Sequence, residues 1–138
     1  MVRISRNRMD METGRIDRPV LKDYGETLVG GASGTNTTSS YAIDISTGNV
    51  FNLILSANCT FTFTNPPASG VSCSFTLILA QDGTGSRTAT WPAAVKWPGG
   101  TAPTLSTAAG AIDVLTFTTV DGGTTWLGAV AGQAFAAP

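Results

Sequence analysis

Few side chains in this sequence could take part in a chemical reaction. Histidine is absent from the 138 residues, and this removes the commonest general base and the usual metal ligand. No Ser-His-Asp or Cys-His arrangement can therefore form. Paired carboxylates could act as acid and base, but the aspartates from residue 44 onward fall mostly at turns or on polar strand faces, at Asp44, Asp82, Asp113 and Asp121. We therefore expect no catalytic residue and no enzymatic activity.

The scarcity of reactive side chains also argues against a bound metal ion or cofactor. Residues 82–85 read Asp-Gly-Thr-Gly, but a calcium site needs several oxygen ligands and only one carboxylate is available locally. A turn explains this motif better. The two cysteines are too few for a zinc site without histidine, and the Gly-rich residues 30–34 lack the lysine that a phosphate-binding loop requires. We expect no metal and no cofactor.

The three tryptophans are the remaining residues that could recognise a ligand. Indole rings stack on sugar rings, and exposed aromatic side chains mark recognition surfaces. Trp91 and Trp97 are the candidates for a glycan contact, whereas all three tryptophans, Trp126 included, could equally fill the core at strand ends. Core packing is the interpretation we favour.

Charge is concentrated at the N-terminus. Six of the eight basic residues precede Tyr24, against three acidic residues in residues 1–22, and only five charged residues follow Asp44. Such a charged segment cannot bury itself, so we expect an extended arm that docks on a larger partner. No aromatic residue precedes Tyr24 to support nucleic-acid binding, and no apolar run is long enough for a membrane span or a signal peptide. We expect neither nucleic acid nor membrane as a partner, and synthesis in a cytoplasm.

The elements that would position these residues are short strands. Residues 25–40 are rich in Gly, Ser, Thr and Asn, which is typical of a linker. Alternating or continuous apolar runs separated by Gly and Pro turns then predict strands at residues 41–45, 50–56, 59–64, 73–79, 88–91, 95–97, 112–119 and 124–130. Asp121-Gly122 between the last two predicts a hairpin. We therefore predict an arm and linker at residues 1–40 and an all-β, antiparallel, jelly-roll-like β-sandwich at residues 41–138.

The two cysteines share a strand parity with neighbouring phenylalanines. Cys59 shares its parity with Phe61 and Phe63, and Cys73 shares its parity with Phe75, Leu77 and Leu79, so both thiols should face the core. If these two strands pair around the intervening loop, the thiols could lie close together. A disulfide and a reduced buried pair both remain open, and we favour the reduced pair.

Three segments together resemble a module of tailed-bacteriophage virion proteins. They are NPPASG from Asn65, FTLILAQDGTGSRTATWPAAVKWPGGTAP from Phe75 and DVLTFTTVDGGTTWLG from Asp113. The resembling region covers about residues 41–130. Similar modules end tail-fibre chains and occur in small capsid or tail accessory proteins. The resemblance implies a β-sandwich that commonly forms a homotrimer, has no catalytic activity and belongs to the virion.

Tail fibres normally place this module after a long shaft, whereas about forty residues precede it here. We therefore expect a capsid decoration, or cement, protein on the capsid exterior, made in the cytoplasm of a bacterial host, whose arm binds the major capsid protein. The expected arm contacts are Arg3, Ile4, Arg6, Arg8, Arg15, Ile16, Arg18, Val20 and Leu21, with Val2 as a further apolar contact. The alternative is a tail-fibre or tail-tip receptor-binding or adaptor protein, which would bind a tail protein through its arm and a host glycan through Trp91 and Trp97.

Overall fold

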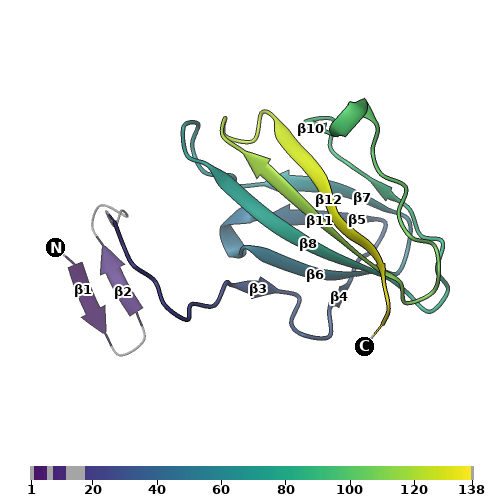
Figure 1. Cartoon of the computed structure of the whole chain (residues 1–138), viewed down its shortest axis with the longest axis horizontal. Helices are drawn as coiled ribbons and strands as arrows, with labels where there is room; N and C mark the ends of the chain where they lie inside the picture. The colour runs from purple at the N-terminus through teal and green to yellow at the C-terminus, as the bar shows by residue number, and fades with distance from the viewer. Residues whose placement is uncertain (1, 6–7, 12–17, 138) are drawn as a thin grey trace.

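The N-terminal segment forms a small hairpin that lies apart from the rest of the protein (Figure 1). The structure is a computed structural model that describes residues 2–5, 8–11 and 18–137. Strands β1 (Val2–Ser5) and β2 (Arg8–Met11) pair antiparallel, with Val2 opposite Met11. Residues 18–27 then lead to the body with no regular secondary structure. The pairing of β1 with β2 was not predicted from the sequence, and the extended arm at residues 1–40 stays a prediction.

The body is an all-β fold of two sheets packed against each other (Figure 1), which confirms the predicted fold class. The larger sheet has seven strands in the order β10-β12-β11-β8-β6-β3, with β4 also paired to β6. Its strands in that order, with β4 last, are Val95–Lys96, Trp126–Phe135, Ile112–Thr119, Cys73–Gln81, Val50–Leu55, Leu28–Val29 and Thr35–Asn36. The smaller sheet contains β5 (Ser40–Asp44), β7 (Cys59–Thr64) and β9 (Ala89–Thr90).

The strand pairing differs from the antiparallel, jelly-roll-like arrangement that we predicted. Only β11 runs antiparallel to its neighbours β8 and β12 within the body, whereas the remaining pairs described are parallel. The cause is that β5, β6, β7, β8 and β9 alternate between the two sheets. Two successive crossings bring the chain back to the same sheet in its original direction, so neighbouring strands run parallel.

The larger sheet begins before residue 41. Strands β3 and β4 both pair with β6, and Thr37, which is buried, donates its backbone N–H to the carbonyl of Ile54 at 2.8 Å. Gly30, between β3 and β4, has a φ of 101°, and a Cβ at this position would lie 2.1 Å from the carbonyl oxygen of Asn52. The predicted linker therefore contains two short strands of the larger sheet, at residues 28–29 and 35–36. The division into a separate arm and folding unit stays a prediction.

Aromatic side chains fill the space between the sheets. Phe75 and Phe117 stack with centroids 5.0 Å apart, and Phe63 from the smaller sheet meets both rings edge-on. Trp126 completes this cluster and is only 2% exposed, so its predicted role in the core is confirmed. Each such pair contributes about 0.5–1.5 kcal/mol beyond area burial, which gives the two sheets a specific packing arrangement.

The two cysteines are free thiols in different sheets. Cys59 lies on β7 and is buried, whereas Cys73 begins β8 and is half-buried. Our suggestion that their strands pair is wrong, because β7 pairs with β5 and β9, and β8 pairs with β6 and β11. Burial raises the pKa of both thiols, which keeps them protonated and unreactive near neutral pH.

The predicted Asp-Gly hairpin joins β11 to β12. Asp121 accepts a hydrogen bond from the backbone N–H of Thr125 at 2.9 Å, and Gly122 has a φ of 72°. The backbone hydrogen bond from Thr125 lowers the pKa of Asp121. Strand β12 runs to Phe135, well into the C-terminal segment beyond the strand that we predicted at residues 124–130.

Two 3₁₀ helices, η1 (Ile45–Thr47) and η2 (Pro98–Gly100), complete the described secondary structure. Asp44 caps η1 by accepting the backbone N–H of Ser46 at 3.0 Å. No helix among the described residues is long and apolar enough to cross a membrane.

Candidate functional site

The structure describes only some of the arm residues that we expected to bind a partner. Arg6, Arg15 and Ile16 lie outside the described residues. Arg3 and Ile4 are on β1 and Arg8 is on β2. None of the arm assignments is tested by these positions, and they stay predictions.

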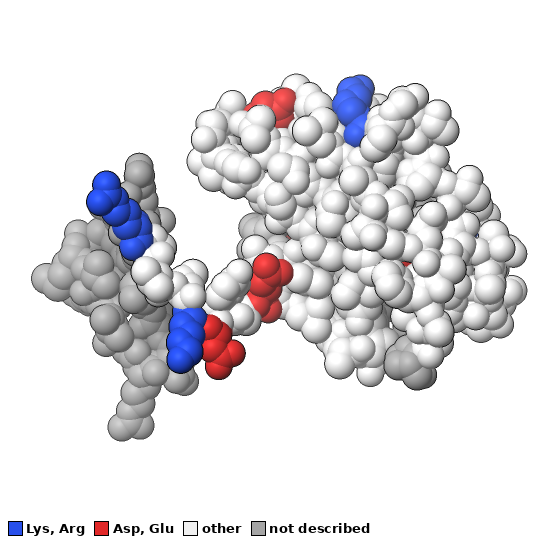
Figure 2. Space-filling view, in the orientation of Figure 1, with Lys and Arg blue, Asp and Glu red and all other residues white. Residues whose placement is uncertain are grey.

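The described end of the arm is strongly exposed. Val20 is 96% exposed and Leu21 is 64% exposed, and Arg18 beside them is exposed as well. Basic and acidic side chains gather on this connecting segment, whereas the face of the body in the same view is almost uncharged (Figure 2).

Trp91 and Trp97 pack against the hydrophobic core. Trp91 stacks on Phe61 with centroids 5.2 Å apart and rings 14° from parallel. Trp97 meets Phe117 edge-on at 5.6 Å and contacts Trp91 at 5.5 Å. Both indoles are half-buried, and Phe61 already covers one face of Trp91. Core packing accounts for this arrangement, and the glycan contact stays a prediction.

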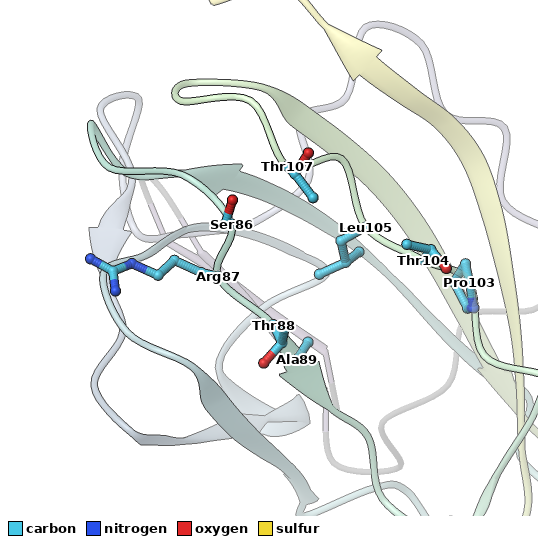
Figure 3. Close-up of a pocket in the computed structure, with 8 residues that line it drawn as sticks. All are labelled: Ser86, Arg87, Thr88, Ala89, Pro103, Thr104, Leu105 and Thr107. Atoms are coloured by element: carbon cyan, nitrogen blue, oxygen red, sulfur yellow. The ribbon is translucent and has the colours of Figure 1, made fainter.

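A small hollow opens between two loops at one end of the body (Figure 3). It has a volume of about 200 Å³ and is lined by residues 86–89 and 103–107, with the exception of Ser106. Leu105 points into the space between the two segments, whereas the Arg87 side chain points away from it (Figure 3). The lining includes four residues that carry hydroxyl groups, namely Ser86, Thr88, Thr104 and Thr107. The hollow could therefore accept a small polar group by hydrogen bonding.

The Gln81 side chain forms hydrogen bonds with both segments that line this hollow. Its side-chain Nε2 donates to the carbonyl oxygens of Arg87 and Ser106, each at 2.9 Å, and its Oε1 accepts the backbone N–H of Arg87 at 2.8 Å. Gln81 is buried, so this amide makes three hydrogen bonds away from solvent. Such bonds hold the two loops at a fixed separation.

Asp82 forms a turn and an ion pair. Its Oδ1 accepts the backbone N–H groups of Thr84 and Gly85, and its Oδ2 accepts the guanidinium of Arg87 at 2.8 and 3.0 Å. The hydrogen bond from Arg87 is the main cause that lowers the pKa of Asp82. Both carboxylate oxygens are therefore engaged, as the turn interpretation of residues 82–85 requires.

Asp113 is a buried carboxylate beside the same wall. It is 2% exposed and accepts the backbone N–H of Ser106 at 2.7 Å, the Ser106 hydroxyl at 2.6 Å and the backbone N–H of Ala134 at 3.0 Å. Burial by itself would raise the pKa of Asp113, but these hydrogen bonds together with one from Gln133 lower it. Asp113 thus stays ionised. Its hydrogen bonds connect β11 to Ser106 and to Gln133 and Ala134 near the C-terminus.

Asp82 and Asp113 both act as hydrogen-bond acceptors that hold neighbouring segments in place. The carboxylates of Asp82 and Asp113 are both saturated by fixed donors, and neither has the raised pKa of a general acid. Within residues 2–5, 8–11 and 18–137, no group of three His, Cys, Asp or Glu side chains could hold a metal ion.

Sequence reasoning missed the supporting role of Gln81 and Asp113. Gln81 on β8 points to the same side of the sheet as the buried Leu79. Asp113 on β11 points to the same side as the buried Leu115. A polar residue at an inward strand position must find hydrogen-bond partners. That parity was the available signal.

One comparison with known proteins identifies a family. Residues 35–125 match the family model described as "Putative phage tail fibre C-terminal domain". The matched region extends from β4 through β11 and includes the whole smaller sheet and the hollow. No curated protein and no solved structure matches the chain. Because the match covers more than half of its residues, the chain belongs to the phage tail-fibre C-terminal domain family and is a structural protein of the virion.

Proposed function

We propose that this protein is a tail-fibre or tail-tip component that binds the host receptor or adapts a receptor-binding protein to the tail. The family match over residues 35–125 is the observation that carries the proposal. From the sequence we expected a capsid decoration protein first and a tail protein as the alternative. The family supports the alternative better, since its description names the tail fibre.

The arm is the proposed attachment to a tail protein. It holds most of the basic residues of the chain, and Val20 and Leu21 are exposed. An isolated two-stranded hairpin such as β1–β2 is marginally stable in water, so binding a partner would complete its sheet or cover one side of it. A segment that gains order in this way loses entropy on binding but covers a large area for its length.

The body is the proposed contact with the host. The serine and threonine residues that line its hollow offer hydrogen bonding, and the half-buried Trp91 and Trp97 elsewhere on the body offer aromatic surface of the kind that recognises sugars. In this proposal the body forms a homotrimer, performs no reaction, and needs neither a cofactor nor nucleic acid nor a membrane. Three linked bodies would turn a weak individual contact into firm attachment.

Adsorption tests the receptor-binding role. Fluorescently labelled full-length protein should bind cells of the phage's host saturably, should slow phage adsorption in proportion to the sites occupied, and should not bind a strain that the phage does not adsorb to. The absence of cell binding together with unchanged adsorption would leave only the adaptor role within the proposal.

A further inference from the structure

The two segments that line the hollow of Figure 3 are joined to each other by hydrogen bonds. Ser86 donates its backbone N–H to the carbonyl oxygen of Thr107 at 2.8 Å. The Gln81 amide donates to the carbonyl oxygens of Arg87 and Ser106, one on each segment. A site whose walls are already held in place loses little conformational entropy when a ligand binds. The hollow is therefore preorganised for binding.

Ser86 has an unusual backbone conformation for a residue with a side chain. Its φ is 60°, in the left-handed region that glycine adopts at low cost and other residues uncommonly adopt. Gly85 before it has a φ of 73°, and a Cβ there would lie 2.5 Å from the carbonyl oxygen of Thr107. Non-glycine residues in such conformations concentrate at functional sites. Ser86 thus places a hydroxyl at a position where the backbone alone would favour glycine.

The hydroxyls that line the hollow are available to a ligand. Ser106, which lies between two lining residues, uses its own hydroxyl to bind Asp113 at 2.6 Å. The hydroxyls of Ser86 and Thr107, by contrast, have no hydrogen-bond partner within the described part of the chain, and both residues are exposed. A serine or threonine hydroxyl can donate one hydrogen bond and accept others. The hydroxyl groups of a sugar have the same capacity, so the two kinds of group are complementary.

Charge near the hollow disfavours an ionised ligand. Arg87 is the one charged residue among those that line it, and its side chain points away and is bound to Asp82 at 2.8 and 3.0 Å (Figure 3). Behind the second segment, the buried carboxylate of Asp113 accepts its hydrogen bonds from uncharged donors, including Ser106 and Ala134. An ionised group in the hollow would lose water without gaining a counter-charge, and an anion would also be repelled by Asp113. An uncharged ligand is therefore favoured.

The size and the apolar part of the lining suit a single sugar ring. Ala89, Pro103 and Leu105 supply apolar surface, and Leu105 points into the space between the segments (Figure 3). A sugar ring presents hydroxyl groups around its edge and C–H groups on its faces, so it can contact both kinds of lining. The volume of about 200 Å³ is below the range of about 300–1,000 Å³ found for drug-sized ligands. The hollow therefore has room for one ring of a longer glycan.

We propose that this hollow binds one uncharged sugar residue of the glycan on the host surface. The hydroxyls of Ser86 and Thr107 bind hydroxyl groups of the sugar, and Leu105 contacts the C–H face of its ring. This inference rests on the proposed receptor-binding role, and it adds the site and the chemical class of the ligand.

Two substitutions remove the hydroxyls with little effect on the fold. Ser86→Gly also relieves the positive φ, and Thr107→Val keeps the shape of an exposed side chain. The matched controls are Asn65→Gly, at another positive φ, and Thr62→Val, at an exposed threonine on β7. Asn65 follows the end of β7, whereas the hollow residue Ala89 pairs with Cys59 at its start, so this control lies away from the hollow.

Isothermal titration calorimetry would measure binding to full-length wild type and to the four variants. The probes are oligosaccharides released from the surface glycan of the phage's host and separated by anion exchange into a neutral and an acidic fraction. We expect wild type and both controls to bind the neutral fraction and not the acidic one. Each hollow variant should raise the dissociation constant for the neutral fraction about 3- to 10-fold, as the loss of one hydrogen bond predicts. Circular dichroism would verify that each variant is folded, and either hollow variant alone suffices.

The possible failures separate this inference from the proposed function. Folded hollow variants that bind the neutral fraction as tightly as wild type would overturn the site. Preference for the acidic fraction would overturn the ligand class. Binding to host cells without binding of the neutral fraction would likewise overturn this inference, yet all three results leave the receptor-binding role intact. A wild-type protein that binds neither fraction nor host cells overturns both.

Discussion

The aspartates of the body act as hydrogen-bond acceptors that fix turns and chain ends. Asp44 accepts the backbone N–H of Ser46, and the hydrogen bond from the Ser46 hydroxyl is the main cause that lowers its pKa. Asp82 and Asp121 hold their turns in the same way. Asp113 differs because it is buried and joins segments distant in sequence, so it is the residue whose loss should matter most.

Replacing Asp113 with asparagine should destabilise the body and weaken its response to acid. The variant loses an acceptor for the Ser106 and Ala134 donors, which we expect to cost about 1–3 kcal/mol at pH 7. The folded-state pKa of Asp113 lies below its unfolded value, so its contribution is complete above a pH of about 4 and is lost as the pH falls through the folded value. Urea unfolding at pH 7 and pH 3 measures both effects.

Wild type should therefore lose more stability between these pH values than Asp113→Asn does, and exposed Asp23→Asn should behave like wild type. Equal acid sensitivity in wild type and Asp113→Asn would show that Asp113 has no such role. Asp44, Asp82 and Asp121 also have lowered pKa values, so the variant should retain part of the acid response.

Local residue roles could be predicted from sequence, and remote ones could not. The Asp121 turn follows from an Asp-Gly step between two β-prone runs, and the structure confirms it. The partners of Asp113 lie at Ser106 and Ala134, and no spacing rule connects them. The packing of Trp126 could be anticipated, but the identity of the rings around it depends on how the sheets stack.

At the scale of elements, strand positions could be predicted but not strand partners. The alternation at residues 59–64 and the apolar run at residues 50–56 match β7 and β6 closely. Pairing depends on whether a connection turns back within one sheet or crosses to the other, and NPPASG between β7 and β8 crosses. The two-residue strands β3 and β4 have no usable periodicity, because they form only by pairing with β6.

Two truncations test where the body begins. Removing residues 1–22 should leave the melting temperature within about 2 °C of wild type, because both sheets remain intact, although the protein should no longer bind particles. Removing residues 1–39 deletes β3, β4 and the hydrogen bond from Thr37 to Ile54, and should lower the melting temperature by at least about 5 °C. Calorimetry of the two shortened proteins would decide. Equal melting temperatures would restore the boundary near residue 41 that the sequence predicts.

At the scale of the whole molecule, charge and surface divide the chain into two parts. The arm carries most of the basic residues, whereas the body has few charged residues and a small hollow whose lining includes serine and threonine. The virion family could be inferred from sequence motifs because they reflect the turns and strands of the body. The position on the virion could not, because a decoration protein and a tail protein share the same requirements for an arm and a β-sandwich body.

The location of the protein on the phage particle tests the central claim most directly. Immunogold electron microscopy with an antibody against the body should be combined with quantitative mass spectrometry of purified particles. We expect gold at the tail and far fewer copies than of the major capsid protein. Gold spread over the capsid, with a copy number matching the many equivalent sites on the shell, would contradict the tail assignment and favour decoration.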